Sequence, residues 1–174
     1  MASSMYNTEN IVSNGIPEAA GMRIGIVVSE WNDNITSDLQ KGAVETLQKF
    51  GVSAGDIMIE HVPGSFELIY ASAQLAKSGL VDAVIAIGCV IRGDTPHFDY
   101  ISSGVTQGIA AINQQSDVPV VFGVLTTNNL QQAEERSGGI IGNKGDEFAI
   151  TAIKMIDFYR NLRKKNVTLH LKGG

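Results

Sequence analysis

The uninterrupted apolar run from Ala83 to Ile91 limits the fold more than any other stretch of the sequence. A strand whose side chains are apolar in both directions must be covered on both faces, which is typical of parallel sheets flanked by helices. Two more strand-like runs precede it, at residues 23–29 and 56–62, and another follows at residues 118–125. Segments with helical periodicity separate these runs. The sequence therefore predicts an alternating α/β chain.

The segments between the strand-like runs carry apolar residues at helical spacing. We expect helices at residues 35–50, 65–78 and 96–112, a short helix up to residue 136, and another that begins after residue 145 and runs through residue 158. Their lengths suit right-handed crossovers between parallel strands. The fold class that follows is α/β: a single doubly wound three-layer domain of the flavodoxin-like kind, with a four-stranded parallel sheet and helices on both faces.

The two ends of the chain differ from this alternating segment. Residues 1–20 show no apolar period, so we expect a mobile arm with at most one edge strand, near Ile11 and Val12. Residues 21–162 form the predicted domain, and residues 163–174 a basic tail without periodicity. Because the chain shows no internal repeat and no linker, its length indicates one domain.

The composition excludes several classes of function. A net charge of −5 and an isoelectric point of about 5.1 argue against broad affinity for nucleic acid. The apolar runs are shorter than the roughly 20 residues of a membrane-spanning helix, and residues 1–10 lack the regions of a secretory signal. Cys89 is the only cysteine, and the three histidines have no metal-ligand spacing. We therefore expect a cytoplasmic protein without a metal, nucleic acid or membrane partner.

One short loop after the central apolar run carries most of the candidate chemistry. Gly93 and Asp94 begin a charged turn, and Pro96 forces Thr95 into an extended conformation. We expect Thr95 to cap the following helix, with Pro96 at its first position. The loop then combines free backbone amides, a hydroxyl and His97 at a helix N-terminus. These groups suit a site that holds an anion and moves protons beside it.

Because parallel strands end at the same edge of a sheet, four polar segments should meet there, at residues 29–34, 63–67, 91–97 and 125–129. Three side chains in them have two interpretations each. Glu67 either accepts hydrogen bonds from a ligand or complements a helix dipole. Trp31, the only tryptophan, either stacks on a flat heterocycle or caps the core. His97 is either a proton-transfer residue or a structural loop histidine.

The sequence does not match two common nucleotide-binding patterns. The sequence Gly142-Asn143-Lys144-Gly145 looks like a phosphate-binding loop, but no Ser or Thr follows the lysine and the preceding segment is helical in pattern. The dinucleotide-binding glycine spacing is also missing after the first strand. Nucleotide hydrolysis and nicotinamide chemistry therefore lose support. Cys89 lies inside an apolar strand, which favours a buried and unreactive thiol.

Together the motifs resemble the lumazine synthase family over roughly residues 23–158. The segments that carry the resemblance are VPGSFE at 62–67, GCVIRGDTPHFDY at 88–100, FGVLTT at 122–127, QAEER at 132–136 and GNKG at 142–145. The resemblance implies a transferase of riboflavin biosynthesis. Such an enzyme condenses 5-amino-6-(D-ribitylamino)uracil with 3,4-dihydroxy-2-butanone 4-phosphate, and it releases 6,7-dimethyl-8-ribityllumazine, phosphate and water. No metal and no organic cofactor are implied.

The same resemblance implies roles for particular residues. His97 would be the catalytic, proton-transfer residue. The pyrimidine and its ribityl chain would be bound by Trp31, Ser65, Phe66, Glu67, Cys89, Val90 and Ile91, and by Phe122 of a neighbouring subunit. The phosphate would be bound by Gly93, Asp94, Thr95, Arg136 and Lys144.

The resemblance also implies a homo-oligomer that acts on small molecules. Family members form pentamers with active sites between adjacent subunits, and in some members the pentamers build an icosahedral shell. Residues 137–145 have the length associated with shells, but Ile140 and Ile141 are less polar than expected there. The choice between pentamer and shell stays open, and riboflavin synthase is a candidate partner. Two alternatives to catalysis also stay open: a silent relative that binds lumazine or flavin, and a relative whose function is the shell itself.

Overall fold

The computed structural model describes residues 15–172, with side chains up to residue 165. Its main sheet contains β1 (Ile24–Ser29), β2 (Ile57–Val62), β3 (Ala83–Ile91) and β4 (Val120–Thr127). The strands are all parallel and lie in the order β2-β1-β3-β4. The predicted four-stranded parallel sheet is confirmed. The edge strand expected near residues 11–12 lies outside the described residues.

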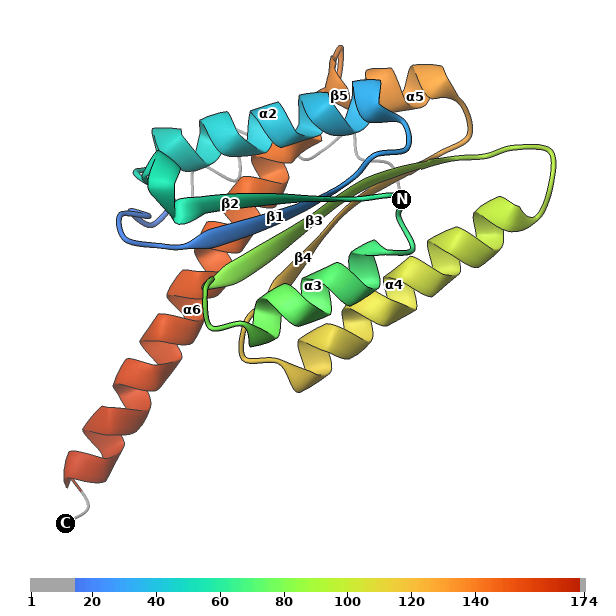
Figure 1. The fold of residues 1–174 in the computed structure, drawn as a ribbon. Coiled ribbons are helices and arrows are strands. Elements are labelled where there is room, and N and C mark those ends of the chain that lie inside the picture. The colour runs from blue at the N-terminus through green and yellow to red at the C-terminus, as the bar shows by residue number, and fades with distance from the viewer. Residues whose placement is uncertain (1–14, 173–174) are drawn as a thin grey trace.

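Helices cover both faces of the sheet (Figure 1). On one face lie α2 (Asp33–Lys49) and α6 (Lys144–Lys172), and on the other lie α3 (Leu68–Lys77) and α4 (His97–Gln115). The connections contain η2 (Ala54–Asp56), α5 (Leu130–Glu134), and a small hairpin of β5 (Ser137–Gly139) and β6 (Gly142–Asn143). The three-layer α/β class that the sequence predicts is therefore confirmed.

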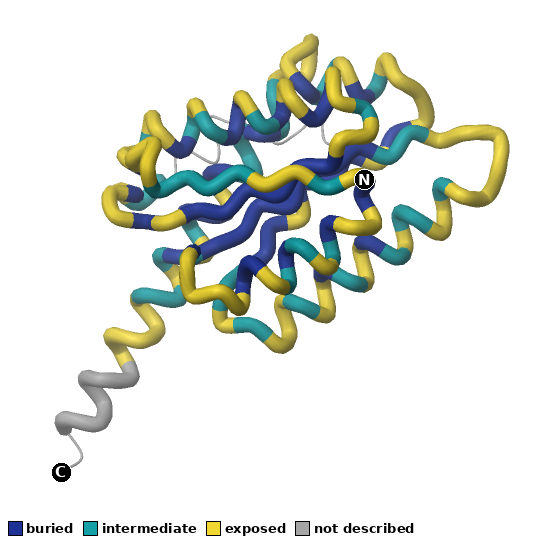
Figure 2. Tube along the Cα trace, viewed as in Figure 1, coloured by how far each residue is buried: buried dark blue, intermediate teal, exposed yellow. Residues whose placement is uncertain are grey.

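The two faces of the sheet form two separate apolar clusters. Ile26 and Ile85 point toward α2 and α6, whereas Val27 and Val84 point toward α3 and α4. β1 and most of β3 are buried, as Figure 2 shows. Burying each such side chain stabilises the fold by about 1.5–3 kcal/mol. The continuous apolar run of β3 is thus explained by its place in the middle layer.

Two helix starts differ from the prediction. α3 begins at Leu68, three residues later than expected, because residues 63–67 form a separate turn. Thr95 does not cap α4: the capping position is taken by Pro96, no side chain bonds to the cap, and His97 is the first helical residue. The main-chain carbonyl of Pro96 accepts from the N–H groups of Asp99 and Tyr100 instead.

The structure also differs toward the C-terminus. The hairpin of β5 and β6 is not predicted by the sequence, since strands this short carry no alternating pattern. α6 continues without a break to Lys172, so the expectation of a tail without regular structure is wrong. In Figure 1 the last turns of α6 extend beyond the sheet. Their side chains from Asn161 to Lys165 are exposed, which explains why no apolar period marks them.

The last part of the expected N-terminal arm is bound to the domain. Ala19 is fully buried, and its N–H donates to the carbonyl oxygen of Phe50 at 2.9 Å. Ile16 is partly buried against the same cluster as α2. Residues 16–20 therefore do not behave as the mobile arm that the sequence suggests, and residues 1–14 lie outside the described part of the chain.

Asp82, just before β3, joins three elements through its carboxylate. Arg23 donates its main-chain N–H and its guanidinium to the two carboxylate oxygens, at 3.0 and 2.8 Å. Arg160 of α6 donates to the carboxylate at 3.2 Å. Partial burial raises the pKa of Asp82, but the hydrogen bonds from Arg23 and the two positive charges outweigh this, so its pKa lies below the ordinary 3.8.

This carboxylate predicts a particular pH dependence of stability. Because the pKa of Asp82 is lower in the folded chain, its stabilisation is complete above pH 3.8 and is lost as the pH falls through and below that value. We expect Asp82→Asn to lower the free energy of unfolding at pH 7 by about 1 kcal/mol, and by less at pH 3. Urea denaturation at both pH values measures this. An equal loss at both, or a similar effect in the control Asp117→Asn, would contradict it.

Candidate active site

The polar segments that follow the strands meet at one end of the sheet, as expected. After β1, the N–H of Glu30 donates to the carbonyl of Val62 at 2.8 Å, and that of Trp31 donates to the carbonyl of Pro63 at 3.2 Å. After β3, the N–H of Arg92 donates to the carbonyl of Thr127 at 2.9 Å. In Figure 1 these loops lie at the same end as the start of α2. The rim is therefore a continuous, hydrogen-bonded structure.

Trp31 and Glu67 lie together at one part of this rim, on either side of Gly64. A Cβ atom on Gly64 would lie 3.9 Å from the indole ring of Trp31 and 3.0 Å from a carboxylate oxygen of Glu67. Both side chains therefore approach the backbone at Gly64 closely. Trp31 is 68% exposed, so it does not cap the core. Its exposed ring is available to stack on a flat ligand beside the Glu67 carboxylate.

Ser65 and Phe66 are fixed by two other glycines. Ser65 is buried, and a Cβ atom on Gly88 would lie 2.7 Å from its hydroxyl oxygen. Phe66 lies against α4, where a Cβ atom on Gly104 would lie 2.8 Å from its ring. Half of the Phe66 side chain remains exposed. These contacts hold residues 63–67 as a turn between β3 and α4, which explains the late start of α3.

The end of β3 forms the floor between the two parts of the rim. The carbonyl oxygen of Cys89 accepts a hydrogen bond from the side chain of Asn32 at 2.9 Å. Burial raises the pKa of the Cys89 thiol to about 11, so the thiol stays protonated near neutral pH. This agrees with a buried, unreactive cysteine. Val90 and Ile91 are half-buried and complete the strand.

The loop after β3 forms the second part of the rim. Gly93, Asp94 and Thr95 are exposed, and so is His97 at the start of α4. The Arg92 guanidinium spans the loop: it donates to a carboxylate oxygen of Asp99 at 2.9 Å and lies 4.1 Å from the centre of the Phe98 ring. The loop is therefore tied to the first turn of α4.

The two more distant phosphate-binding candidates are engaged with their own neighbours. The Arg136 guanidinium donates to the carbonyl of Gln132 at 2.8 Å and lies 3.7 Å from the carboxylate of Glu135. The Lys144 ammonium lies 2.5 Å from the carboxylate of Glu147 in the first turn of α6. Arg136 follows α5, which comes directly after the rim segment of β4. Lys144 lies further along the chain, beyond the β5–β6 hairpin.

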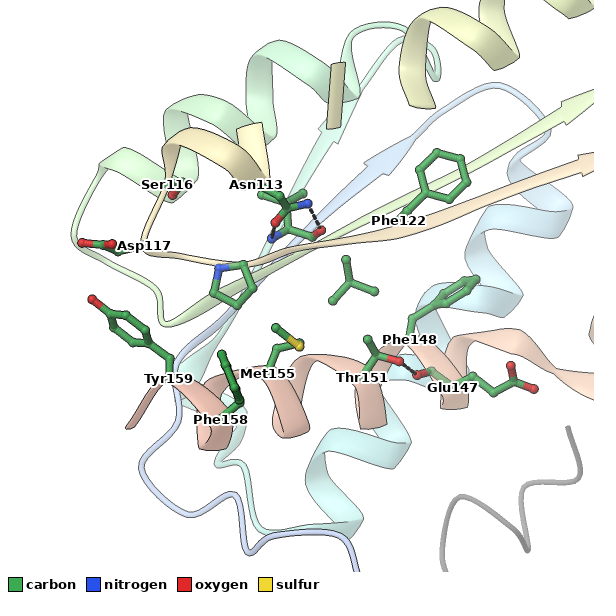
Figure 3. A pocket seen from close by; sticks show the side chains of 13 residues that line it. Asn113, Ser116, Asp117, Phe122, Glu147, Phe148, Thr151, Met155, Phe158 and Tyr159 are labelled. Atoms are coloured by element: carbon green, nitrogen blue, oxygen red, sulfur yellow. Dashed lines mark hydrogen bonds between the residues drawn. The ribbon is translucent and has the colours of Figure 1, made fainter. Parts of the chain in front are cut away.

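Phe122 lies away from the rim of its own chain. It stands in the first half of β4, beside Ala86, and 38% of its surface is exposed. It lines a groove of about 690 Å³ between β4, α6 and the end of α4. Figure 3 shows Phe122 with the other lining residues, which include Phe148 and Met155. The structure thus unites the candidates from Trp31 to His97 along one rim and separates Phe122 from them.

Sequence reasoning missed Asn32, which adopts a left-handed backbone conformation with φ 58° and ψ 47°. Asparagine is one of the few residue types that tolerate this conformation. Its position between an exposed tryptophan and a helix was a signal that could have been used. Gly104 was also missed, because a glycine inside a helix gives no sign of the ring that covers it.

Two further observations limit the kind of site. Among the residues whose side chains are described, no three or more His, Cys, Asp or Glu residues lie close enough to hold a metal ion. In the same part of the chain, no helix has the length and apolar character needed to cross a membrane.

Comparison with known proteins gives one consistent result. The 6,7-dimethyl-8-ribityllumazine synthase family matches residues 21–160. The chain is 58% identical over 167 residues to the 6,7-dimethyl-8-ribityllumazine synthase of Phocaeicola vulgatus, which covers 96% of this chain and 99% of that protein. It is also 58% identical over 160 residues to the protein of the same name from Porphyromonas gingivalis, covering 92% and 99%. With the Flavobacterium johnsoniae protein, identity is 55% over 155 residues, covering 89% and 82%. The match spans the whole sheet and every rim segment, and the chain therefore belongs to the 6,7-dimethyl-8-ribityllumazine synthase family.

Proposed function

We propose that this chain condenses 5-amino-6-(D-ribitylamino)uracil with 3,4-dihydroxy-2-butanone 4-phosphate to form 6,7-dimethyl-8-ribityllumazine, phosphate and water. The observation that carries the proposal is the arrangement of the rim. An exposed indole ring and a carboxylate flank Gly64 at one part, and an exposed glycine-containing loop leads into a helix N-terminus at the other. The family membership supports the same reaction.

The chemistry needs what the rim offers. The aryl amine of the pyrimidine attacks the ketone and a first water leaves. Phosphate is then eliminated, and the ribitylamino nitrogen closes the second ring on the carbonyl that this exposes, with loss of a second water. Each of these steps moves a proton, and the elimination needs a stabilised phosphate leaving group. Holding the two substrates side by side supplies much of the remaining acceleration. None of the steps transfers electrons to or from the protein.

The residues divide between the two substrates. At the first part of the rim, Trp31 stacks on the pyrimidine and Glu67 accepts hydrogen bonds from its N–H groups. Ser65, Phe66 and the backbone of residues 89–91 line the space for the ring and the ribityl chain. At the second part, Gly93, Asp94 and Thr95 bind the phosphate at the N-terminus of α4, where the helix dipole favours an anion. His97 is the proton-transfer residue beside them.

The position of Phe122 supports an active site shared between copies of this chain. Its groove also contains Met155 and Phe158, which are 40% and 59% exposed. An apolar edge of this kind is suited to burial against another subunit. In the proposed pentamer, Phe122 of one copy covers the pyrimidine bound at the rim of the next. Ile140 is 89% exposed at the hairpin tip, and the choice between pentamer and shell stays open.

The direct test is to incubate the purified chain with both substrates and follow the fluorescence of the lumazine product. The proposal expects product to form with release of one phosphate per lumazine. Binding of lumazine without turnover would instead identify a silent relative, and an assembled shell with neither binding nor turnover would identify a structural protein. Light scattering during the assay separates pentamer from shell. Activity that persists in dilute monomer would contradict the shared site.

Arg136 gives a prediction specific to one substrate. We expect Arg136→Ala to raise the KM for the butanone phosphate about thirtyfold, because a charge-assisted hydrogen bond to phosphate is lost, and to change the KM for the pyrimidine little. Steady-state kinetics with each substrate varied in turn measures both values. Arg163→Ala is a suitable control, since Arg163 lies beside Tyr159 near the end of the described side chains of α6. Equal changes in both KM values would refute the assignment.

A further inference from the structure

We propose that Asn32 is a positioning residue for the pyrimidine end of the site, which fixes the direction in which Trp31 points. The inference rests on the proposed function, because it assumes that Trp31 stacks on the pyrimidine substrate. Three observations support it independently: the backbone conformation of Asn32, the use of its side chain, and the way Trp31 is held.

The backbone of Asn32 is unusual for a residue with a side chain. Within residues 15–172 it is the only residue other than glycine with a positive φ angle. Glycine adopts this conformation more easily, so the turn alone does not require asparagine. Backbone strain of this kind is found most often at functional sites. The side chain must therefore contribute something that glycine would lack.

The side chain makes a bond that an asparagine at this position does not ordinarily make. Asn32 occupies the N-cap of α2, where an asparagine oxygen usually accepts from the N–H groups of the first turn. Here it makes no such bond, and its main-chain carbonyl accepts from Ile35 and Thr36 instead, at 2.9 and 3.0 Å. The side-chain amide donates to the carbonyl of Cys89 at 2.9 Å. The amide thus links the loop after β1 to the end of β3.

With this link, hydrogen bonds hold the loop that carries Trp31 from two sides. The N–H groups of Glu30 and Trp31 bind the loop to Val62 at the end of β2 and to Pro63 after it. The Asn32 amide binds the same loop to β3 on the other side. The indole ring itself has little packing, since it is 68% exposed and lies against Gly64. Because packing does not hold the ring, the direction of the loop backbone decides where it points.

A more mobile loop should weaken the binding of one substrate, the pyrimidine, and leave the other unaffected. The stacking contact between Trp31 and the pyrimidine is made in the bound complex and in the transition state alike. Loss of such a contact raises KM and leaves kcat nearly unchanged. The butanone phosphate is bound at the other part of the rim, so its KM should not change.

Two variants test this without removing the fold. Asn32→Gly keeps the left-handed backbone accessible but removes the amide, and Asn32→Asp keeps the shape but replaces the donor with an acceptor that faces a carbonyl. We expect Asn32→Gly to raise the KM for the pyrimidine about fivefold, the effect of one lost hydrogen bond, and Asn32→Asp to raise it more. In both, kcat and the KM for the butanone phosphate should stay within about twofold of wild type.

The fluorescence anisotropy of Trp31 gives a reading that does not depend on turnover, since this is the only tryptophan. Its decay should show wider motion of the indole in both variants. Thr36→Val is the matched control, because it removes a buried hydrogen bond across the same loop, from the Thr36 hydroxyl in α2 to the carbonyl of Ser29 at the end of β1. It should lower the melting temperature but leave the pyrimidine KM and the anisotropy at wild-type values.

The outcomes are separable from those of the proposed function. Wild-type anisotropy and wild-type pyrimidine KM in both Asn32 variants would overturn the inference, and so would equal changes in the KM values of both substrates. If the wild-type chain forms no lumazine, the proposed function fails. The anisotropy of the Asn32 variants, compared with Thr36→Val, then still decides whether Asn32 orients Trp31.

Discussion

A His97→Ala variant is expected to form lumazine about a hundredfold more slowly than the wild type at saturating concentrations of both substrates, the factor typical of a lost general acid–base residue. Activity should not vanish, because the rim still holds the two substrates side by side. The KM values should change little, since His97 is exposed at the start of α4 and is proposed to move protons rather than to bind. Fluorescence assays under saturating conditions measure the effect.

Two comparisons make the His97 result interpretable. His61, exposed on the edge strand β2, is the other histidine whose side chain is described, and His61→Ala should keep the wild-type rate. Added imidazole should restore part of the activity of His97→Ala by replacing the missing proton carrier. Full turnover of His97→Ala at saturation would show that the assigned role is wrong.

A Gly145→Ala variant is expected to lose about 3 kcal/mol of unfolding free energy, at the upper end of the cost of overpacking a core. A Cβ atom at Gly145, in the first turn of α6, would overlap the carbonyl oxygen of Leu39 and lie 2.9 Å from the main-chain nitrogen of Ala43. Both atoms belong to the backbone of α2, so no side chain can move aside. The two helices must separate, and the melting temperature should fall by about 6–12 °C.

Gly55 provides the control for this experiment. It lies in η2, its φ is not positive, and a Cβ atom there would meet nothing within 4 Å. Gly55→Ala should therefore leave the melting temperature unchanged or raise it slightly, since alanine restricts the unfolded chain. Calorimetry of the two variants beside the wild type tests the prediction. A similar melting temperature for Gly145→Ala and Gly55→Ala would mean that α2 and α6 tolerate a wider spacing.

The sheet could be predicted from the sequence because its two central strands, β1 and β3, are buried on both faces over most of their length. The apolar run at Ala83–Ile91 has one physical explanation, and the structure places it in the middle layer. The meeting of the rim segments followed from the parallel arrangement alone. These features depend on the hydrophobicity averaged over a whole strand, and changing one residue alters that average little.

Features that depend on individual contacts could not be predicted from the sequence. α3 starts at Leu68 rather than at residue 65 because Ser65 and Phe66 pack against glycines of β3 and α4. No local sequence pattern reveals these contacts. The continuation of α6 to Lys172 was missed because an exposed helix needs no apolar stripe. The left-handed turn at Asn32 also had no periodic signal.

The candidate site was predictable only in part, for a related reason. Residues on the rim loops were found because each directly follows a strand. The distance of Phe122 from its own rim follows from its place near the start of β4, and a strand pattern says nothing about which subunit a side chain serves. That role and those of Arg136 and Lys144 stay predictions for the experiments above.

The order of the elements has a consequence for how the chain folds during synthesis. β1 lies between β2 and β3, so it pairs on both sides only after Ile91 has left the ribosome. The face that includes Ile26 and Ile85 is covered in part by α6, which is made after all four strands of the sheet. A nascent chain therefore exposes apolar strands until α6 has been made. Such chains fold slowly and are prone to aggregate, so a truncation that removes α6 should leave the product dependent on chaperones.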